Sequence, residues 1–374
     1  MTAGPRPQGG GAFGARHAAE PPPLDRGAFG ATGVSGTLGG DTPALEQTNP
    51  AQSPGKAVAP SPRWVRRVGP LMVAVAVAAV PFGFVPTITS ALTRMAAFAV
   101  LVVSLDLLTG VAGMPSLGQA APWGVGGYAA ALVALHVSPL APVQLVVAAA
   151  AGGALAAAIG WLAVRLRGLN FLMITLALAE LVHALANQWS SLTGGSNGLV
   201  GLPFIRVLPA GPPLVATGYV LWYALAVAIV CIAIMVAISR SAFGRTLRGI
   251  RDNEDRMRAL GYSTFWPKYV VFCIAGVMAG AAGSLWVAQA QFVSPGSLEF
   301  EISALALMAV VIGGRGTLYG PALGAALVVL VRYELSPYLS GRGRLLLGAV
   351  FVLVVYLLPR GLAGLRPAPR RVRS

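Results

Sequence analysis

The stretch LVATGYVLWYALAVAIVCIAIMVAI, from Leu214 to Ile238, decides the fold class. It contains no charged side chain and exceeds the ~20 residues that an α-helix needs to cross a hydrocarbon core. It runs directly into SRSAFGRTLRGIRDNEDRMRALG, Ser239 to Gly261, which we call the charged segment. Within it Phe243, Leu247, Ile250 and Met257 recur at helical spacing and predict one narrow apolar face. The order predicts a membrane span followed by an amphipathic helix.

Composition extends this reading to the whole chain. Of its 374 residues 56% are hydrophobic and only 10% are charged, which excludes a soluble globular domain and predicts an all-α, polytopic membrane bundle. The formal net charge of +15 does not indicate nucleic acid, because the arginines lie at the ends of apolar runs and on the tails. Cys231 and Cys273 both lie in apolar runs, so neither a disulfide framework nor a metal site is indicated.

Apolar windows predict about ten spans, with a range of eight to ten. We place them at Val68–Pro86, Thr89–Leu108, Leu117–His136, Pro142–Val164, Phe171–Asn187, Leu214–Ile238, Tyr269–Ala290, Ile302–Ile312, Leu318–Tyr333 and Leu345–Leu358. The eighth is short and can be a re-entrant or broken helix. The positive-inside rule puts both termini in the cytoplasm, although this count leaves Arg332, Arg342 and Arg344 outside.

Three regions follow from the distribution of apolar residues. Residues 1–62 are predicted to be a disordered cytoplasmic tail rich in Gly and Pro. Residues 63–362 form the transmembrane domain, with a cytoplasmic loop at 239–268, and residues 363–374 form a basic cytoplasmic tail. The first apolar stretch is too long for a cleaved secretory signal and is expected to remain as an anchor.

Gly-rich and polar breaks interrupt the apolar pattern at Thr109–Ala121 and again at Gly313–Gly324. In a membrane, such backbone is tolerated only where it is buried in protein or lines a wet cavity. The two breaks predict a pathway built from internal repeats, and the span count gives both the same orientation. Alternatively, their small residues only let helices pack closely. A third break, Leu192–Leu199, is either a pathway mouth or a loop of turn formers.

Polar residues at or near these breaks are the candidates for a substrate pathway. They are Ser116, Gln119, Asn170, Thr175, Glu180 and Asn197. An acid at membrane depth is a functional hypothesis by default, but Glu180 can also form a local hydrogen bond or ion pair with His183. For Asp106, near a predicted helix end, a capping or snorkelling role is favoured over a functional one.

Four blocks, in this order and spacing, resemble one known family. They are RLRGLNFLMITLALAE (Arg165–Glu180), TGGSNG (Thr193–Gly198), GRTLRGIRDNE (Gly244–Glu254) and VIGGRGTLYGP (Val311–Pro321). Together they resemble the LivM-type permease of branched-chain amino-acid ABC transporters, in the LivH/LivM permease family. The resemblance covers roughly Leu71 to Pro359, and four separate blocks are far more specific than one.

The resemblance implies a permease subunit in a bacterial plasma membrane that imports branched-chain amino acids, or related small amino acids, amides or urea. Its implied partners are a homologous LivH-type permease, two cytoplasmic ATPase subunits, a periplasmic or lipid-anchored binding protein, and membrane lipid. The charged segment then resembles the family's ATPase-coupling loop. The implied coupling residues are Phe243, Gly244, Arg245, Leu247, Arg248, Ile250, Arg251, Asp252, Asn253, Glu254 and Gly261.

The residues themselves indicate how the charged segment would work. Its apolar face can enter a groove on a partner, and its acids favour a protein partner over a lipid surface, for which such helices are usually basic. Asp252 or Asn253 can cap a second helical turn, which Gly261 can end. No phosphate-binding Gly-x-x-x-x-Gly-Lys-Ser/Thr loop is present, so ATP and Mg²⁺ are expected on the partner subunits and this chain is not expected to be an enzyme.

Two rival classes remain open at this stage. An ion-coupled secondary transporter or channel needs intramembrane ionisable groups, of which Asp106 and Glu180 are the only supply. A membrane enzyme needs a nucleophile and base pair or a metal cluster, and the predicted spans offer neither.

Overall fold

The computed structural model describes residues 86–203, 206, 217–317, 320–335 and 343–357, all of which belong to the unit Ser61–Ser374. This part of the chain is helical and has no strand; its only bridges are the isolated pairs Leu140 with Arg206 and Leu199 with Val293. The all-α prediction is therefore confirmed for the described residues. The predicted first span and the two tails lie outside them.

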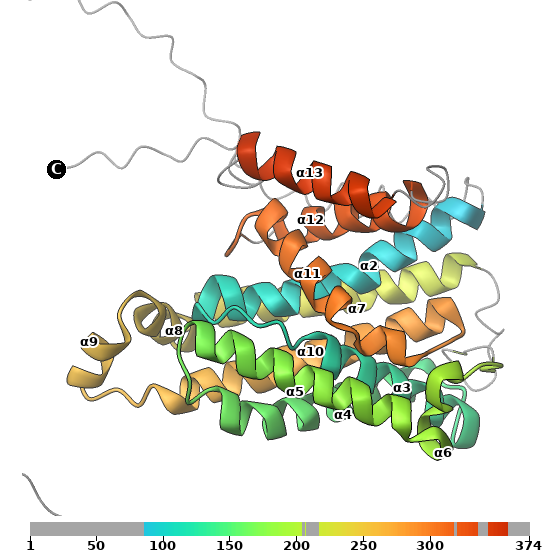
Figure 1. The fold of residues 1–374 in the computed structure, drawn as a ribbon, viewed down its shortest axis with the longest axis horizontal. Helices are drawn as coiled ribbons and strands as arrows, with labels where there is room; N and C mark the ends of the chain where they lie inside the picture. Colours follow the sequence, from blue (N-terminus) through green and yellow to red (C-terminus); the bar gives the residue numbers. More distant parts are fainter. Residues whose placement is uncertain (1–85, 204–205, 207–216, 318–319, 336–342, 358–374) are drawn as a thin grey trace, which may run out of the picture. The chain divides into compact units, whose positions relative to one another are not determined.

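The helices follow the predicted apolar windows closely (Figure 1). The long ones are α2 (Pro86–Asp106, continued by the π-helical turn Leu107–Ala112), α4 (Ala141–Ala163), α5 (Leu169–Gln188), α7 (Thr217–Arg240) and α10 (Phe265–Ala290). The shorter ones are α3 (Ala120–His136), α6 (Ser190–Thr193), α8 (Ala242–Asp252), α9 (Glu254–Ala259), α11 (Phe300–Gly313), α12 (Gly320–Val329, continued by a second π-helical turn Leu330–Leu335) and α13 (Gly343–Leu357).

Within the described residues five helices are long and apolar enough to cross a membrane: Ile88–Ala112, Ala141–Ala163, Leu169–Gln188, Tyr219–Arg240 and Phe265–Ala290. The third, eighth, ninth and tenth predicted spans correspond to the shorter helices α3, α11, α12 and α13, and α11 has 14 residues, as expected of a short eighth segment. The prediction of about ten full spans is therefore supported only in part.

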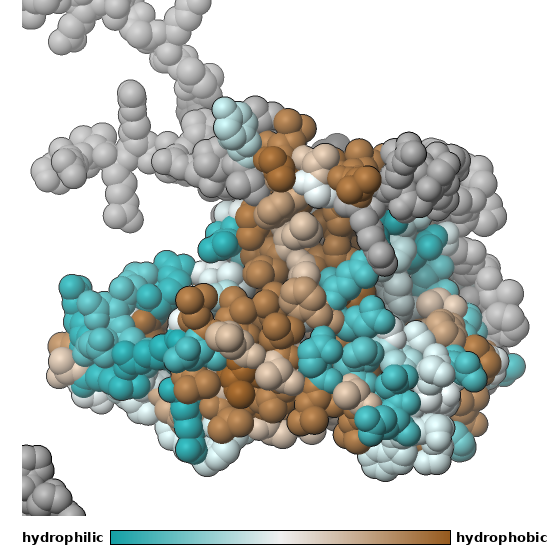
Figure 2. Space-filling view, in the orientation of Figure 1, coloured by the Kyte–Doolittle hydropathy of each residue, from teal (hydrophilic) through white to brown (hydrophobic). Residues whose placement is uncertain are grey.

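Two helices form the centre of the bundle. The most apolar stretch of α2 is 89% buried and that of α10 is 72% buried, whereas the value for α5 is 22%. Helix α2 packs on α7, α10 and α12, and α10 packs on α3 and α4. Helices α4, α5 and α7 consequently present broad apolar faces to the outside, part of which Figure 2 shows as a brown band.

Glycines allow α3, α4 and α10 to pack backbone against backbone. A Cβ added to Gly280 would lie 2.3 Å from the carbonyl oxygen of Ala148, and one added to Gly126 would lie 2.4 Å from Gly280 Cα. Such close approach is typical of membrane helices, which associate through small residues. In this region the glycines serve helix packing.

Both predicted breaks in the apolar pattern are observed. The first follows the π-helical turn, where Gly113 has φ of 72°, and lasts until α3 begins at Ala120. The second follows α11, where Gly314 has φ of 100°, and lasts until α12 begins at Gly320. In the third, Leu192–Leu199, the backbone of Leu199 pairs with that of Val293 and the Thr193 hydroxyl donates to the Ala186 carbonyl at 2.6 Å.

Candidate functional site

The charged segment folds as two short helices, α8 and α9. The Ser241 hydroxyl accepts a hydrogen bond from the Gly244 amide at 3.1 Å and so caps α8. Leu247 and Ile250 of the predicted apolar face are buried, together with Gly244. Leu247 is 0% exposed and belongs to the main core, while Phe243 is half-buried against that core.

This burial corrects one part of the sequence interpretation. We expected the apolar face of the charged segment to enter a groove on a partner, but α8 packs it against α7, the Leu107–Ala112 turn and α10 of the same chain. The fourth member of the stripe, Met257, lies on α9 and folds back over α8, where its sulfur would be 3.0 Å from a Cβ added to Gly249. A partner therefore meets mainly polar side chains on α8, whose Leu247 and Ile250 are buried.

Helix α9 is capped as the sequence predicts, by the second of the two candidate residues. The side-chain oxygen of Asn253 accepts a hydrogen bond from the Arg256 amide at 2.9 Å. At the other end the Gly261 amide donates to the Arg258 carbonyl at 2.9 Å, which closes the last turn. The two helices are therefore separated by a sharp bend at Asn253.

Glu254 is the electrostatic centre of α9 and is turned inward. Its carboxylate binds Lys268 Nζ at 2.5 Å, Arg167 Nε at 3.1 Å and Arg258 Nη2 at 3.0 Å. Burial raises its pKa, but the hydrogen bond and charge of Lys268, a hydrogen bond with Thr264 and the charge of Arg167 together hold it below the ordinary value. Glu254 thus ties α9 to α10 and to the loop between α4 and α5.

Arg167 completes this inner network, since its Nη1 also lies 3.0 Å from the Asp255 carboxylate. Nearby, the Arg165 guanidinium lies 5.1 Å from the ring centroid of Trp161, over its face. The sequence analysis included Arg165 and Arg167 in the first of the four family blocks but did not pair them with the charged segment. The only available signal was that these arginines sit at the end of an apolar run.

Three arginines of α8 are anchored to backbone carbonyls. Arg251 Nη1 donates to the Gly110 carbonyl at 2.5 Å, Arg248 Nη1 donates to the Ser239 carbonyl at 2.7 Å, and Arg245 Nη1 donates to the Arg240 carbonyl at 3.4 Å. Arg251 also lies beside the Asp252 carboxylate at 3.2 Å. Of these three cations, Arg248 is half-buried, whereas Arg245 and Arg251 are exposed; the contact of Arg245 is the longest of the three.

Arg251 is bonded to Gly110, at the point where the backbones of the first two breaks are in contact. A Cβ added to Gly110 would lie 2.4 Å from the Gly316 nitrogen, so the backbones of the two breaks touch. The Gly316 amide donates to Asp106 Oδ1 at 2.8 Å, and Asp106 is fully buried. Asp106 thus has neither the capping nor the snorkelling role that its position suggested, because its side chain makes no cap hydrogen bond and is buried; it binds a backbone amide 210 residues away instead. Both breaks lie at the α8 end of the bundle, as the span count predicted.

Three of the six predicted pathway residues are buried at the first break. The Ser116 hydroxyl accepts from the Gly118 amide at 3.1 Å, the Gln119 amide donates to the Ser104 hydroxyl at 3.3 Å, and Thr175 touches the backbone of Gly118 from α5. The Ser303 hydroxyl joins them by accepting from the Ala120 amide at 2.8 Å. Sequence reasoning missed Ser104 and Ser303, because single serines inside apolar runs carry no distinctive pattern.

The other three, Asn170, Glu180 and Asn197, are exposed and are not brought together with the first group. Glu180 lies 3.4 Å from His183 Nδ1, which is the local contact that the sequence suggested. The exposed side of α5 also includes Ala177 and Ala184, with Met173 and Leu181 beside them, so small, polar and large apolar residues share this side.

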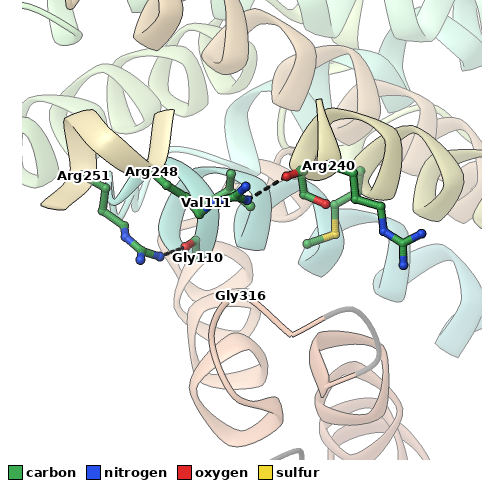
Figure 3. Close-up of a pocket in the computed structure, with 8 residues that line it drawn as sticks. Gly110, Val111, Arg240, Arg248, Arg251 and Gly316 are labelled. Carbon is green, nitrogen blue, oxygen red and sulfur yellow. Dashed lines mark hydrogen bonds between the residues drawn. The ribbon is translucent and has the colours of Figure 1, made fainter. Parts of the chain in front are cut away.

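Two cavities adjoin the charged segment. One, of about 390 Å³, is lined by both signs of charge, including Arg167, Lys268 and Glu254. The other, of about 350 Å³, is lined by Arg240, Arg248 and Arg251 together with Gly110 and Gly316 (Figure 3). Within the described ranges no three His, Cys, Asp or Glu side chains gather in a way that could hold a metal ion.

Comparison with known proteins places this geometry in context. Residues 87–355 match the family model described as the branched-chain amino acid transport system permease component. The chain is 31% identical over 290 residues to the high-affinity branched-chain amino acid transport system permease protein LivM of Escherichia coli K12, covering 71% of this chain and 67% of the relative.

The same-named protein of Salmonella typhimurium LT2 is 30% identical over 302 residues, covering 74% of this chain and 70% of the relative. The autoinducer 2 import system permease protein LsrC of Klebsiella pneumoniae is 30% identical over 211 residues, covering 53% of this chain and 59% of the relative. No solved structure matches the chain.

Proposed function

The chain belongs to the family of branched-chain amino acid transport system permease components, and on that premise we propose that it is the permease subunit of an ATP-driven importer. The family inferred from the four sequence blocks is thereby confirmed, since all four blocks lie within the matched residues. LivM of E. coli and LivM of S. typhimurium, the relatives that the chain resembles over about 70% of its length, are permeases of branched-chain amino acid transport systems.

The proposed cargo is a branched-chain amino acid, or a related small amino acid, amide or urea. The proposed assembly pairs this chain with a homologous permease in a bacterial plasma membrane, adds two cytoplasmic ATPase subunits that hold ATP and Mg²⁺, and receives cargo from a binding protein. This assembly would supply the ATP hydrolysis for which the sequence of this chain carries no phosphate-binding loop.

The observation that carries the proposal is which side of the charged segment is buried and which is exposed. Its apolar side is fixed in the permease core, while Arg245, Asp252, Asp255 and Arg256 remain exposed on α8 and α9. Figure 2 shows hydrophilic residues gathered over these two helices. Interspersed charges of both signs suit a protein partner, because they fix register and partner choice. We propose this exposed polar side as the ATPase-docking surface.

The coupling residues of the resemblance then divide into two groups. Arg245 and Asp252 would meet the ATPase. Arg248, Arg251, Asn253 and Glu254 would hold the docking surface on the permease, as would Phe243, Gly244, Leu247, Ile250 and Gly261. A push on α8 would reach both breaks directly, because Arg251 is bonded to Gly110 and Gly110 touches Gly316.

For the substrate pathway we propose the exposed strip of α5 with Asn170 and Glu180, next to the partner permease. A charged side chain exposed on an apolar helix is costly in lipid and is expected to face protein or water. Ser116, Gln119 and Thr175 lie behind this strip, where they support the first break. Asn197 would lie at the mouth of the pathway.

The docking surface is tested by reversing one exposed charge. Arg245→Glu should lower recovery of the ATPase subunits with the purified permease by about tenfold or more, because it opposes like charges at the interface. Arg206→Glu is the matched control: Arg206 is exposed and its side chain forms no hydrogen bond or ion pair with the described residues. Equal recovery with both variants would contradict the proposed surface.

Transport in proteoliposomes distinguishes an ATP-driven importer from an ion-coupled transporter. ATP-dependent uptake by the complete assembly is expected. Uptake that follows a proton or sodium gradient without ATP would instead favour an ion-coupled transporter.

A further inference from the structure

The cavity beside the charged segment is strongly cationic. Arg240, Arg248 and Arg251 line it together with Gly110, Val111, Met235, Ser239 and Gly316. Its volume of about 350 Å³ is in the range of small-ligand sites. Figure 3 shows Arg248 and Arg251 of α8 on one side of it, with Arg251 bonded to Gly110, and Arg240 of α7 on the other side, its guanidinium directed away from them.

The charges of these arginines are poorly neutralised within the described residues. The Arg248 guanidinium donates only to a backbone carbonyl, that of Ser239, and Arg251 has one carboxylate neighbour, Asp252. The Arg240 side chain is exposed and forms no hydrogen bond or ion pair with the described residues. Backbone carbonyls orient the Arg248 and Arg251 guanidinium groups without cancelling their charge, and Arg240 adds an exposed cation, so the cavity presents donors to an anion. Planar guanidinium donors match phosphate oxygens best.

The position of the cavity favours a lipid headgroup as the source of such a phosphate. Arg240 ends α7, a helix long and apolar enough to cross the membrane, so we expect its guanidinium to lie at the level of the lipid headgroups. Tyr219 and Trp222 are exposed at the opposite end of α7, as expected of an interfacial aromatic anchor. Ile229 and Ala233 are exposed on the same side of the helix as Arg240, at spacings of four and seven residues. An apolar surface therefore leads along α7 to the cations.

We propose that this cavity binds the phosphate of an anionic phospholipid, with Arg240 and Arg248 as the principal donors and the acyl chains against the exposed side of α7. Basic pockets between helices are the sites at which membrane proteins recognise such headgroups. The site is independent of what the permease carries. A bound lipid would touch α8 and, through Gly110 and Gly316, both breaks.

The test is native mass spectrometry of the full-length chain, purified from nanodiscs that contain phosphatidylglycerol and phosphatidylcholine. The wild-type chain should retain phosphatidylglycerol preferentially. Arg240→Gln should lower that preference about fivefold, the effect expected of one cation near an anionic surface, and adding Arg248→Gln should lower it further. Arg206→Gln, at an exposed arginine outside the cavity, should behave like the wild type.

Unchanged preference in the double variant, or an equal loss in Arg206→Gln, would overturn the proposal. Two competitors, inorganic phosphate and the ATPase subunits, distinguish a lipid from other ligands of the cavity. If inorganic phosphate displaces the lipid, the ligand is a soluble phosphate and the lipid assignment is wrong. If purified ATPase subunits displace it, the arginines belong to the docking surface. None of these measurements uses transport, so their failure is distinct from failure of the proposed function.

Discussion

Removal of the Glu254 carboxylate should loosen α9 from the rest of the permease. The buried contact carries most of the effect, because the Glu254 and Lys268 side chains are 14% and 7% exposed. The Arg167 and Arg258 side chains are 41% and 55% exposed, so each of their ion pairs contributes at most about 1 kcal/mol. Hydrogen bonds to charged groups contribute about 1.5–3 kcal/mol. We therefore expect Glu254→Ala to lower the free energy of local opening of α9 by about 2 kcal/mol.

Hydrogen exchange measures this opening directly. The amides of Met257 and Leu260 are bonded to the carbonyls of Asn253 and Arg256, and their protection factors should fall about 30-fold in Glu254→Ala. Asp255→Ala is the matched control, because Asp255 is 81% exposed and has a single ion pair with Arg167. Its effect should stay within about fivefold. Equal losses in the two variants, or no loss in Glu254→Ala, would refute the inward anchoring of Glu254.

Acid should have the same effect as the substitution. The pKa of Glu254 is lower in the folded chain than its ordinary value of 4.5. A carboxylate with a lowered folded pKa contributes stability that is complete above the unfolded pKa and is lost as the pH falls through the folded pKa. After correction for the intrinsic exchange rate, protection of α9 should decline below pH 4.5 in the wild type but not in Glu254→Ala.

The remaining predictions concern helix packing and the pathway. Gly280→Ala should lower the melting temperature in detergent, because the new Cβ would lie 2.3 Å from the Ala148 carbonyl and overpacking costs about 1–3 kcal/mol. Gly348→Ala, whose Cβ would meet nothing within 4 Å, should leave the melting temperature unchanged or raise it, and a loss as large as that of Gly280→Ala would contradict the packing argument. Glu180→Gln should reduce the uptake rate of the complete importer while its melting temperature stays constant, because Glu180 is exposed on α5. Uptake equal to the wild type would remove this side of α5 from the proposed pathway.

Features set by neighbouring residues could be predicted from the sequence. The long apolar runs correspond to helices at the expected places, and helices end within the breaks predicted at Thr109–Ala121 and Gly313–Gly324. The cap at Asn253 and the stop at Gly261 were also predicted, since capping is decided within four residues.

Features that join distant residues could not be predicted. The spacing of Leu247 and Ile250 defines an apolar face but does not say what covers it, and the covering surface proved to be the same chain. Nothing local connects Asp106 to Gly316, or the Ala120 amide to Ser303, which are 210 and 183 residues apart. The inward role of Glu254 was missed for the same reason, because Lys268 and Arg167 belong to other helices or loops.

The burial of the apolar side of α8 limits how this permease can be engineered. Its sequence suggests that the charged segment could be transplanted alone from one permease to another, so that the recipient binds a different ATPase. It is not a separate module, because Leu247 and Ile250 belong to the core and Arg251 is bonded to Gly110. A functional chimaera therefore has to transplant residues 107–114 together with the segment, so that donor and acceptor surfaces remain matched.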